Sequence, residues 1–410
     1  MKIDLDALMQ AHDVDALLIS GPGKHNPMMV YMTGGANLTM GHVIKKRGEA
    51  AVLFYAPMER DEAARTGMKS HNYMEYPQFR AALSGDLDQH AAMLQAMLKD
   101  AGMTEGRLAF YGQVDAFRHF GIVKGLLALA PELRVADNIE DDVVLQAMST
   151  KDEDEVARIR KMGKITTEVV AKTANLLTSS RVMDEVLHKS DGEPLTIGDV
   201  KKQIDVWLME RGSENPEGTI FAIGRDAGVP HSTGTASDVL RLGQTIVYDI
   251  FPCEAGGGYF HDFTRTWCLG YAPDDVVKLY EDVYAVNEQL LTEMEVGKPF
   301  FHFHKRICEL FEEMGHPTVM SKQGTEEGYV HSLGHGVGLK VHELPMCRYH
   351  PEGKPSNVLT PRQVIALEPG LYYPERGMGV RLENTYYISP EGKFENLAPY
   401  PMDLVLPIKG

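Results

Sequence analysis

The sequence has few of the features that mark secreted, disulfide-bonded or membrane-spanning proteins. Its 410 residues include four cysteines (Cys253, Cys268, Cys308 and Cys347), and no two of them have CxxC spacing. We therefore expect a reduced cytoplasmic protein with neither a disulfide framework nor a thiolate metal site. No apolar run approaches the ~20 residues that a membrane-spanning helix needs. The first stretch, MKIDLDALMQAHD, carries acids too early for a signal peptide.

The chain also has fewer basic than acidic residues. The chain has 41 lysines and arginines against 58 acids, a formal net charge of -17. This balance disfavours nucleic acid or an anionic membrane as a partner. The 43% hydrophobic and 24% charged content is ordinary for a globular protein. The length is too great for one ordinary core, so we expect two domains.

The order of predicted elements indicates a mixed α/β (α+β) fold. Near Ser149 the composition changes, and an amphipathic helix with acids in its first turn follows. We therefore predict an N-terminal α/β domain over residues 1–150 and a second domain over 151–410. Periodicity and turn residues predict helices at 4–12, 88–101, 114–129, 152–177, 196–210, 276–294 and 301–314, and strands at 14–20, 50–56, 107–111, 133–136 and 219–224, with strand and loop after 329.

The stretch VYDIFPCEAGGGYFHDFTRT, residues 247–266, predicts a hairpin whose long turn holds three glycines. Period-two alternation places Asp249 on one strand and Asp262 on the other, each among apolar or hydroxyl neighbours. Two buried carboxylates on adjacent strands repel each other, and a bound cation would relieve the repulsion. The alternative interpretation is a pair of ordinary acids, for example paired with Arg265.

A second unusual stretch is HSLGHGVGLKVHE, which holds His331, His335 and His342 with glycines between them. Glycine allows close backbone approach and positive φ, so His335 can be aimed accurately. Downstream, Glu368 in ALEPG and Glu383 in VRLEN lie beside β-forming residues. Each acid alone fits a turn or an ion pair. Four carboxylates and one imidazole together suit two divalent cations bridged by carboxylates, and are too acidic for a structural zinc site.

The words YDIF, FTRT, PHS, HSLGHGVGLKVHE, LEPG and RLEN resemble those of the proline-specific metallopeptidases of the pita-bread fold. That family includes Xaa-Pro dipeptidase (prolidase), aminopeptidase P, methionine aminopeptidase and the metal-free creatinase. The motifs cover about residues 219–390, and the first 150 residues resemble the creatinase-type N-terminal domain. The resemblance implies a creatinase-like α/β domain followed by a pita-bread catalytic domain.

The resemblance also implies roles for individual residues. The expected cofactors are two divalent ions, Mn²⁺ or alternatively Co²⁺, Zn²⁺ or Fe²⁺, with two bridging carboxylates, Asp262 and Glu383. Glu368 is expected to carry a proton besides its ligand role. The implied metal ligands are Asp249, Asp262, His335, Glu368 and Glu383. The implied catalytic residues are His231, His342 and Glu368. The implied substrate-binding residues are His231, His331, His342 and Arg348.

Three departures from the family pattern stand out. The separation of Asp249 and Asp262 is two residues longer than usual, which the glycine turn can absorb. Asn384 replaces a frequent Asp after the last ligand. Met346 stands where dipeptidases often carry an Arg that holds the substrate carboxylate, and Arg348 lies two residues further on.

The resemblance implies hydrolysis of the peptide bond before proline in di- or oligopeptides. The alternatives are an aminopeptidase P-like activity, a creatinase-like C–N hydrolase or lyase acting on a small non-peptide substrate, and a non-catalytic binding module. The resemblance also implies a homodimer, to which the polar loop His25–Pro27 would contribute by completing a neighbouring active site.

Overall fold

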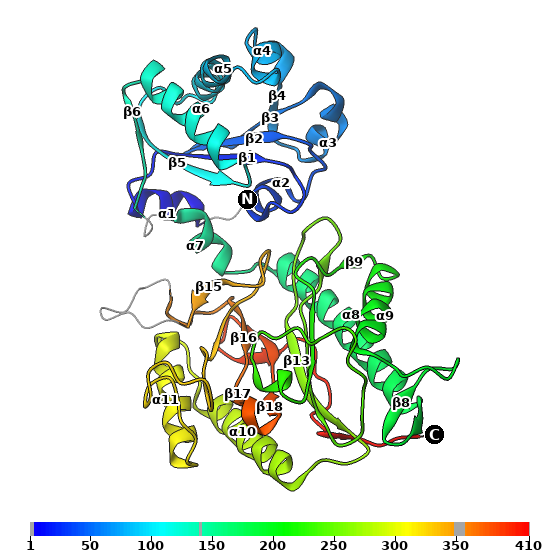
Figure 1. Cartoon of the computed structure of the whole chain (residues 1–410). Coiled ribbons are helices and arrows are strands. Elements are labelled where there is room, and N and C mark those ends of the chain that lie inside the picture. The colour runs from blue at the N-terminus through cyan, green and yellow to red at the C-terminus, as the bar shows by residue number, and fades with distance from the viewer. Residues whose placement is uncertain (1–3, 139–141, 348–356, 410) are drawn as a thin grey trace. The chain divides into compact units, whose positions relative to one another are not determined.

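The computed structural model describes residues 4–138, 142–347 and 357–409. The chain forms two compact units (Figure 1). The first unit comprises Met1–Met148 with Gly256–Gly258, and the second comprises Ser149–Ala255 with Tyr259–Gly410.

The first unit is a six-stranded mixed sheet of strand order β4-β3-β2-β1-β5-β6. Strand β1 pairs parallel with β5 and antiparallel with β2. In Figure 1, α4, α5 and α6 lie on one face of this sheet and α1 and α2 on the other. The elements are α1 (Leu5–Ala11), β1 (Ala16–Gly21), α2 (Pro27–Thr33), β2 (Gly41–Lys46), β3 (Val52–Tyr55), α3 (Arg60–Arg65), β4 (Lys69–Asn72), α4 (Phe79–Leu83), α5 (Leu87–Asp100), β5 (Gly106–Gly112), α6 (Ala116–Leu129), β6 (Leu133–Val135) and α7 (Val143–Ser149).

The polar loop at His25–Pro27 has a local role in this unit. The side chain of Asn26 caps α2 by accepting a hydrogen bond from the Met29 N–H, and it donates to the Ser20 carbonyl at 3.0 Å. Pro27 is the first residue of the helix, where its missing N–H costs nothing. The loop is therefore explained as a helix start, independently of any neighbouring active site.

The second unit contains a four-stranded sheet, β10-β11-β13-β21, and a five-stranded sheet, β15-β14-β16-β19-β20, with shorter two-stranded pairs. The elements are α8 (Glu153–Thr178), β7 (Arg181–Met183), β8 (Val186–His188), α9 (Ile197–Met209), β9 (Ser213–Glu214), β10 (Thr219–Ile223), β11 (Thr245–Ile250), β12 (Cys253–Glu254), β13 (Phe263–Leu269), α10 (Asp274–Glu293), α11 (Phe300–Glu313), β14 (Gly334–Gly336), β15 (Glu343–Met346), β16 (Val364–Leu367), β17 (Gly370–Tyr373), β18 (Met378–Arg381), β19 (Asn384–Ile388), β20 (Phe394–Asn396) and β21 (Val405–Leu406).

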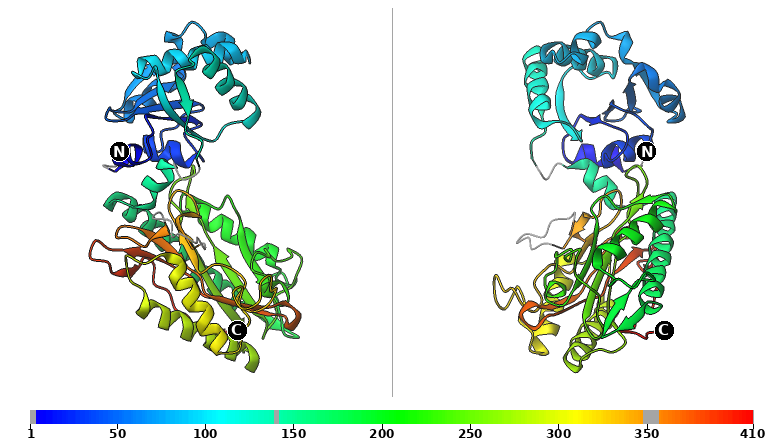
Figure 2. Two further views of the ribbon diagram at one scale, coloured as in Figure 1. Left: turned by 90° about the vertical axis from the view of Figure 1, so that its left-hand side faces the viewer. Right: turned by 45° about the vertical axis from the view of Figure 1, so that its right-hand side comes forward.

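Two hydrophobic cores hold this unit together. One joins α8 and α9 to β10, β11 and β13, and includes Tyr248 and Trp267. The other joins α10 and α11 to strands from β16 to β19, and includes Phe303 and Tyr386. Figure 2 shows the two helix pairs on the outside of this unit, with the strands between them.

The start of α8 explains why the amphipathic helix predicted at 152–177 forms there. Asp152 and Glu155 make a reciprocal capping box, and the first turn carries three acids. Both features satisfy the free N–H groups and the positive end of the helix dipole. Apolar residues then recur along the face that is buried against the sheet.

The predicted hairpin is confirmed. Strands β11 and β13 pair antiparallel, with Asp249 opposite Thr264. The turn uses Gly256 and Gly257 at φ of 94° and 81°, values that favour glycine. Asp262 lies directly before β13 rather than inside a regular strand. It is nevertheless buried, so the hairpin delivers both carboxylates to the interior.

No helix in the described ranges combines the length and apolar character needed to cross a bilayer. All four cysteines are free and buried, where they pack as small apolar side chains.

Candidate metal centre

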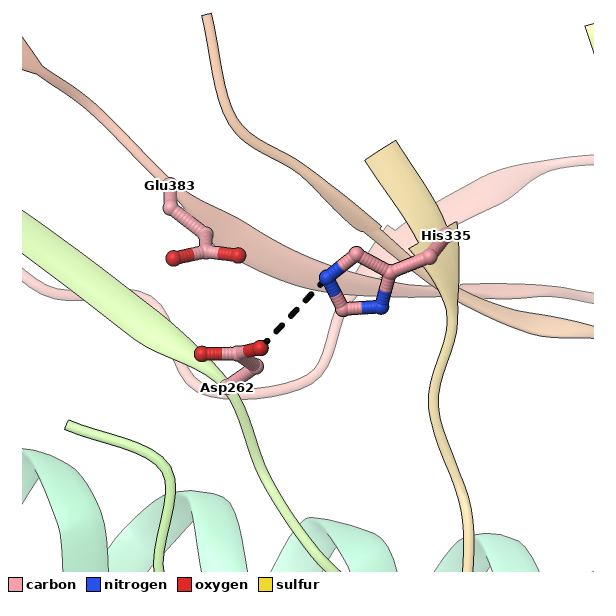
Figure 3. A group of neighbouring side chains, drawn as sticks. All are labelled: Asp262, His335 and Glu383. Atoms are coloured by element: carbon pink, nitrogen blue, oxygen red, sulfur yellow. Dashed lines mark ion pairs between the residues drawn. The ribbon is translucent and has the colours of Figure 1, made fainter. Parts of the chain in front are cut away.

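Three ligand-type side chains converge in the second unit. Donor atoms of Asp262, His335 and Glu383 all lie within 4.8 Å of one another, and all three residues are buried. Figure 3 shows the imidazole directed toward the two carboxylates, with His335 Nε2 at 3.6 Å from Asp262 Oδ2. The three residues come from three separate segments, so only the folded chain brings them together.

Strand pairing fixes these segments. His335 is the central residue of β14 and pairs with Ala366 of β16. Glu383 lies between β18 and β19, and its N–H donates to the Thr264 carbonyl of β13 at 3.1 Å. The position of each donor is therefore set by backbone hydrogen bonds rather than by a flexible loop.

The glycines around His335 are needed because the backbones approach closely. A Cβ on Gly334 would lie 2.0 Å from the Ala366 carbonyl oxygen, and one on Gly336 would lie 2.2 Å from that of Leu344. The expected close approach is confirmed. The expectation of positive φ is wrong, since neither glycine has one.

The protonation of His335 suits a ligand. Its Nδ1 donates to the Gly336 carbonyl at 3.1 Å, which leaves Nε2 with its lone pair toward the carboxylates. Burial, together with the nearby His342, lowers the pKa of His335 to about 3. The ring is therefore neutral at physiological pH.

Glu368 joins this cluster at its edge. It follows β16, and its Oε1 lies 3.7 Å from His335 Nε2 while Oε2 lies 3.9 Å from His331 Nδ1. Its side chain is 19% exposed, against 4% for His335. Burial raises the pKa of Glu368 to about 8, although the Arg381 charge opposes the shift. Glu368 is thus the member of the cluster most open to solvent.

Asp249 has a partner that sequence reasoning missed. Its Oδ2 accepts a hydrogen bond of 2.5 Å from the Arg381 guanidinium, which also donates to Tyr372 Oη at 2.9 Å and to the Pro230 carbonyl at 3.1 Å. Asp249 is therefore already paired with a cationic side chain of the protein. Arg381 is the first residue of the motif RLEN, and the third residue of that motif, Glu383, is one of the predicted ligands.

The alternative in which Arg265 pairs with the hairpin acids is also wrong. This buried guanidinium donates to the backbone carbonyls of Thr264 and Glu383 and to Asn384 Oδ1, each at 2.9 Å. It also bonds the carbonyls of Tyr400 and Pro401. Arg265 thus ties the C-terminal segment to the strand ends that carry the cluster, and Asn384 serves as one of its acceptors.

The cluster has unsatisfied oxygens that fit a cation. Within the described ranges, Asp249 Oδ1, Asp262 Oδ1 and Glu383 Oε1 are buried and have no hydrogen-bond partner. Burial raises the pKa of Asp262 and of Glu383 well above the usual range, and the neighbouring carboxylates add to both shifts. Unpaired buried polar atoms are costly. Oxygen donors with one imidazole fit hard or borderline divalent ions.

The three other histidines differ in their surroundings. Both ring nitrogens of His331 are engaged, with the Ser332 carbonyl at 2.7 Å and Tyr372 Oη at 2.8 Å. His231 and His342 are exposed. The ring of His342 lies 4.3 Å from that of His335, and His231 follows Pro230, which Arg381 holds. Arg348 lies outside the described residues, and Met346 ends β15.

The fold and the buried acid–imidazole cluster define a metallopeptidase-type catalytic unit preceded by an α/β unit. The sequence profile of metallopeptidase family M24 matches residues 157–390, more than half of the chain. The protein therefore belongs to metallopeptidase family M24 and has its pita-bread fold, which confirms the predicted family and fold class. The metallopeptidases of this family use divalent metal ions in hydrolysis.

Two archaeal relatives resemble the chain over nearly its whole length. It is 27% identical to the Xaa-Pro dipeptidase of Pyrococcus horikoshii over 390 residues, covering 94% of this chain and 93% of that protein. It is also 27% identical to the Xaa-Pro dipeptidase of Pyrococcus furiosus, covering 96% and 97%.

Solved structures show the same fold. The prolidase of Pyrococcus horikoshii superimposes with a TM-score of 0.71 at 22% identity and 98% coverage of both chains. The X-Pro aminopeptidase of Thermotoga maritima gives a TM-score of 0.72 at 20% identity, with 96% and 97% coverage.

Proposed function

We propose that this protein is a metal-dependent hydrolase that cleaves the peptide bond before proline, acting as an Xaa-Pro dipeptidase. The observation that carries the proposal is the buried cluster of Asp262, His335 and Glu383, whose unpaired oxygens need a cation. Membership of family M24 supports the hydrolytic chemistry. Full-length similarity to two archaeal Xaa-Pro dipeptidases supports the substrate class.

Five residues would hold two divalent cations in this proposal: Asp249, Asp262, His335, Glu368 and Glu383. The family resemblance implies that Asp262 and Glu383 would serve both ions, and each has one buried oxygen without a hydrogen-bond partner among the described residues. We propose Mn²⁺, with Co²⁺, Zn²⁺ and Fe²⁺ as alternatives that accept the same mixed oxygen and nitrogen donors. When bound, such cations acidify a water molecule and polarise the scissile carbonyl.

Glu368 is the proposed proton carrier. Glu368 is the most exposed of the five proposed ligands, and it lies near both His335 and His331. A carboxylate at this edge can take a proton from the attacking water and deliver it to the leaving proline nitrogen. The assignment rests on position.

His342 and His231 are the proposed substrate-side histidines. Both are exposed, and neither is among the three clustered donors. His342, whose ring is tilted against that of His335, would donate a hydrogen bond to the developing oxyanion. His231, held through Pro230 by Arg381, would bind the substrate near the scissile amide. His331 would contact substrate only by opening one of its two hydrogen bonds.

The preferred substrate length depends on how the carboxylate after proline is bound. Met346 offers only apolar packing, so we propose Arg348 as the carboxylate-binding residue. If Arg348 has this role, Arg348→Ala loses activity on an Xaa-Pro dipeptide selectively, and the C-terminal amide of that dipeptide is already a poor substrate. Equal cleavage of both substrates, before and after the change, would instead indicate an aminopeptidase P-like enzyme.

The creatinase-like alternative is not favoured, because all five ligand-type residues are present and buried or half-buried in one unit.

We also propose that the domains follow the limits 1–150 and 151–410, with a creatinase-type N-terminal domain. We further propose a cytoplasmic homodimer. The family resemblance supports the dimer, and the four free cysteines support the compartment. Sedimentation of a fully active monomer would contradict the dimer.

The direct test of function compares an Xaa-Pro dipeptide with a matched Xaa-Ala dipeptide after metal removal and after addition of Mn²⁺. We expect cleavage of the proline substrate only, and only with metal. Equal cleavage of both dipeptides would contradict the assigned specificity.

A further inference from the structure

A buried ion pair lies close to the candidate metal centre but outside its ligand set. Lys151 Nζ and Glu343 Oε2 are 2.8 Å apart, and each side chain is 1% exposed. Burying an ion pair removes the hydration of both charges. The pair therefore adds little net stability unless the two charged groups also make further hydrogen bonds. None of the roles proposed above involves either residue.

The carboxylate of Glu343 organises a short turn, residues 338–343. Its Oε1 accepts hydrogen bonds from the N–H groups of Leu339 at 2.7 Å and Lys340 at 3.1 Å. The glycine at position 338 leaves room for this carboxylate, since a Cβ there would lie 2.4 Å from Glu343 Oε2. The side chain thus fills the inside of the turn that its own backbone closes.

This turn contacts the candidate metal centre on two sides. His342 is exposed, whereas its neighbours Val341 and Glu343 are buried, so burial of the neighbours fixes the direction of the His342 ring. The Gly338 carbonyl accepts a hydrogen bond of 2.8 Å from the Phe260 N–H, two residues before Asp262. A shift of the turn would therefore displace His342 relative to Asp262 and His335.

Lys151 is anchored to the same framework. Its backbone N–H donates to the Arg362 carbonyl at 2.7 Å, just before β16, the strand that pairs with β14 and His335. Its Nζ also reaches the Ser149 carbonyl at 3.3 Å. The ion pair therefore connects the edge of β16 to the 338–343 turn.

We propose that Glu343, held by Lys151, is a positioning residue that sets the His342 ring for the reaction. The inference rests on the proposed function for its effect on rate, but its structural part can be measured without substrate. Glu343 acts through His342, and it contacts neither substrate nor metal.

The first variant is Glu343→Gln, which keeps size and removes charge. Because it leaves the Lys151 ammonium buried without a partner, a second variant replaces both residues, Lys151→Met with Glu343→Leu. Apolar replacement of a buried ion pair preserves folding in many proteins, yet here it removes the acceptor for the Leu339 and Lys340 N–H groups. Asp6→Asn, which changes a Lys45 ion pair in the first unit, is the matched control.

We expect the double variant to lower kcat by about 10- to 100-fold, the effect of a small misplacement of a catalytic group. Its metal content should equal that of the parent. In a His342→Ala background the same change should lower kcat by less than about twofold, because the residue through which it acts is already lost. Asp6→Asn should leave kcat within about twofold of the parent.

Hydrogen exchange and the NMR spectrum of the His342 ring test the structural part without substrate. We expect roughly tenfold faster exchange of the Leu339 and Lys340 amides and a shifted His342 signal in the double variant. The proposal would be overturned if the Leu339 and Lys340 amides of the double variant exchanged at the rate of the parent and its His342 signal were unshifted. It would also be overturned if the double variant lowered kcat by the same factor in the His342→Ala background as in the parent, or if it lost metal. If the parent cleaves no Xaa-Pro peptide, the proposed function fails, whereas exchange and the His342 signal still decide whether Glu343 positions the ring.

Discussion

At the scale of single residues, the strongest support for cation binding comes from the buried carboxylate oxygens that have no hydrogen-bond partner among the described residues. Glu383 accepts a hydrogen bond from the Thr264 hydroxyl at 2.7 Å through Oε2, while Oε1 has no partner among the described residues. A carboxylate half satisfied by the protein and half left for a ligand fits a bridging role. The neighbouring carboxylates also repel the charge of Glu383, so its ionised form is unfavourable in the absence of a cation.

This arrangement predicts opposite effects of Glu383→Gln with and without metal. The amide keeps the Thr264 contact but removes a charge, so kcat/KM should fall roughly 100-fold or more and the bound metal should decrease. In chelator the variant should be at least as stable as the parent, since one source of repulsion is gone. Thermal unfolding with and without Mn²⁺ measures both effects. Glu254→Gln, in an ion pair with Arg158, should retain metal.

Arg381 gives a second prediction at this scale. Its guanidinium bonds Asp249, Tyr372 and Pro230 at once, a set that one ammonium group cannot reproduce. Arg381→Lys should therefore lower kcat/KM by about 10- to 100-fold while preserving the net charge. An unchanged rate would show that charge alone, rather than the three contacts, is what the site requires.

At the scale of elements, β14 is tightly constrained because backbones approach it on both sides. Gly336→Ala would place a Cβ 2.2 Å from the Leu344 carbonyl oxygen and so separate β14 from β15. We expect a loss of about 1–3 kcal/mol in the free energy of unfolding and weaker metal binding, because His335 moves with the strand.

Gly212→Ala provides the contrast. This glycine has a φ of 68° and open space around it, so the substitution costs about 1–2 kcal/mol through backbone strain alone. Metal affinity should be unchanged. Urea unfolding and metal titration of both variants separate the two effects, and equal metal affinities in both would contradict the role given to β14.

At the scale of the whole molecule, acid should destabilise the first unit through a buried histidine. Burial lowers the pKa of His42 to about 3, and the charges of His90 and His119 act in the same direction. Because the folded pKa lies below the unfolded value of about 6.5, the stabilising contribution is complete above pH 6.5 and is lost as the pH falls toward 3.

His42→Gln should remove this dependence. Between pH 7 and pH 5 the parent should lose roughly 2 kcal/mol more of its unfolding free energy than the variant, close to one proton over 1.5 pH units. Urea unfolding of the chelated proteins at both pH values measures the difference. Parallel losses would show that His42 does not titrate on unfolding.

Local patterns predicted the long helices and the hairpin because their periodicity and caps lie within one segment. Strand β2 escaped prediction because it carries Lys45, a buried lysine whose charge is paired with the distant Asp6. The Arg381–Asp249 pair was missed for the same reason, since 132 residues separate its partners. Metal binding by Asp249, Asp262, His335, Glu368 and Glu383 stays a prediction.

The most direct test of the account is titration of metal-free protein with Mn²⁺ while hydrolysis of an Xaa-Pro dipeptide is followed. The account predicts no turnover in the chelated protein, and recovery that is complete after two equivalents of metal. Asp262→Asn, which changes one proposed bridging ligand, should not recover. Full turnover by protein shown to contain no metal would contradict the central claim that the Asp262–His335–Glu383 cluster holds the ions of a metallopeptidase.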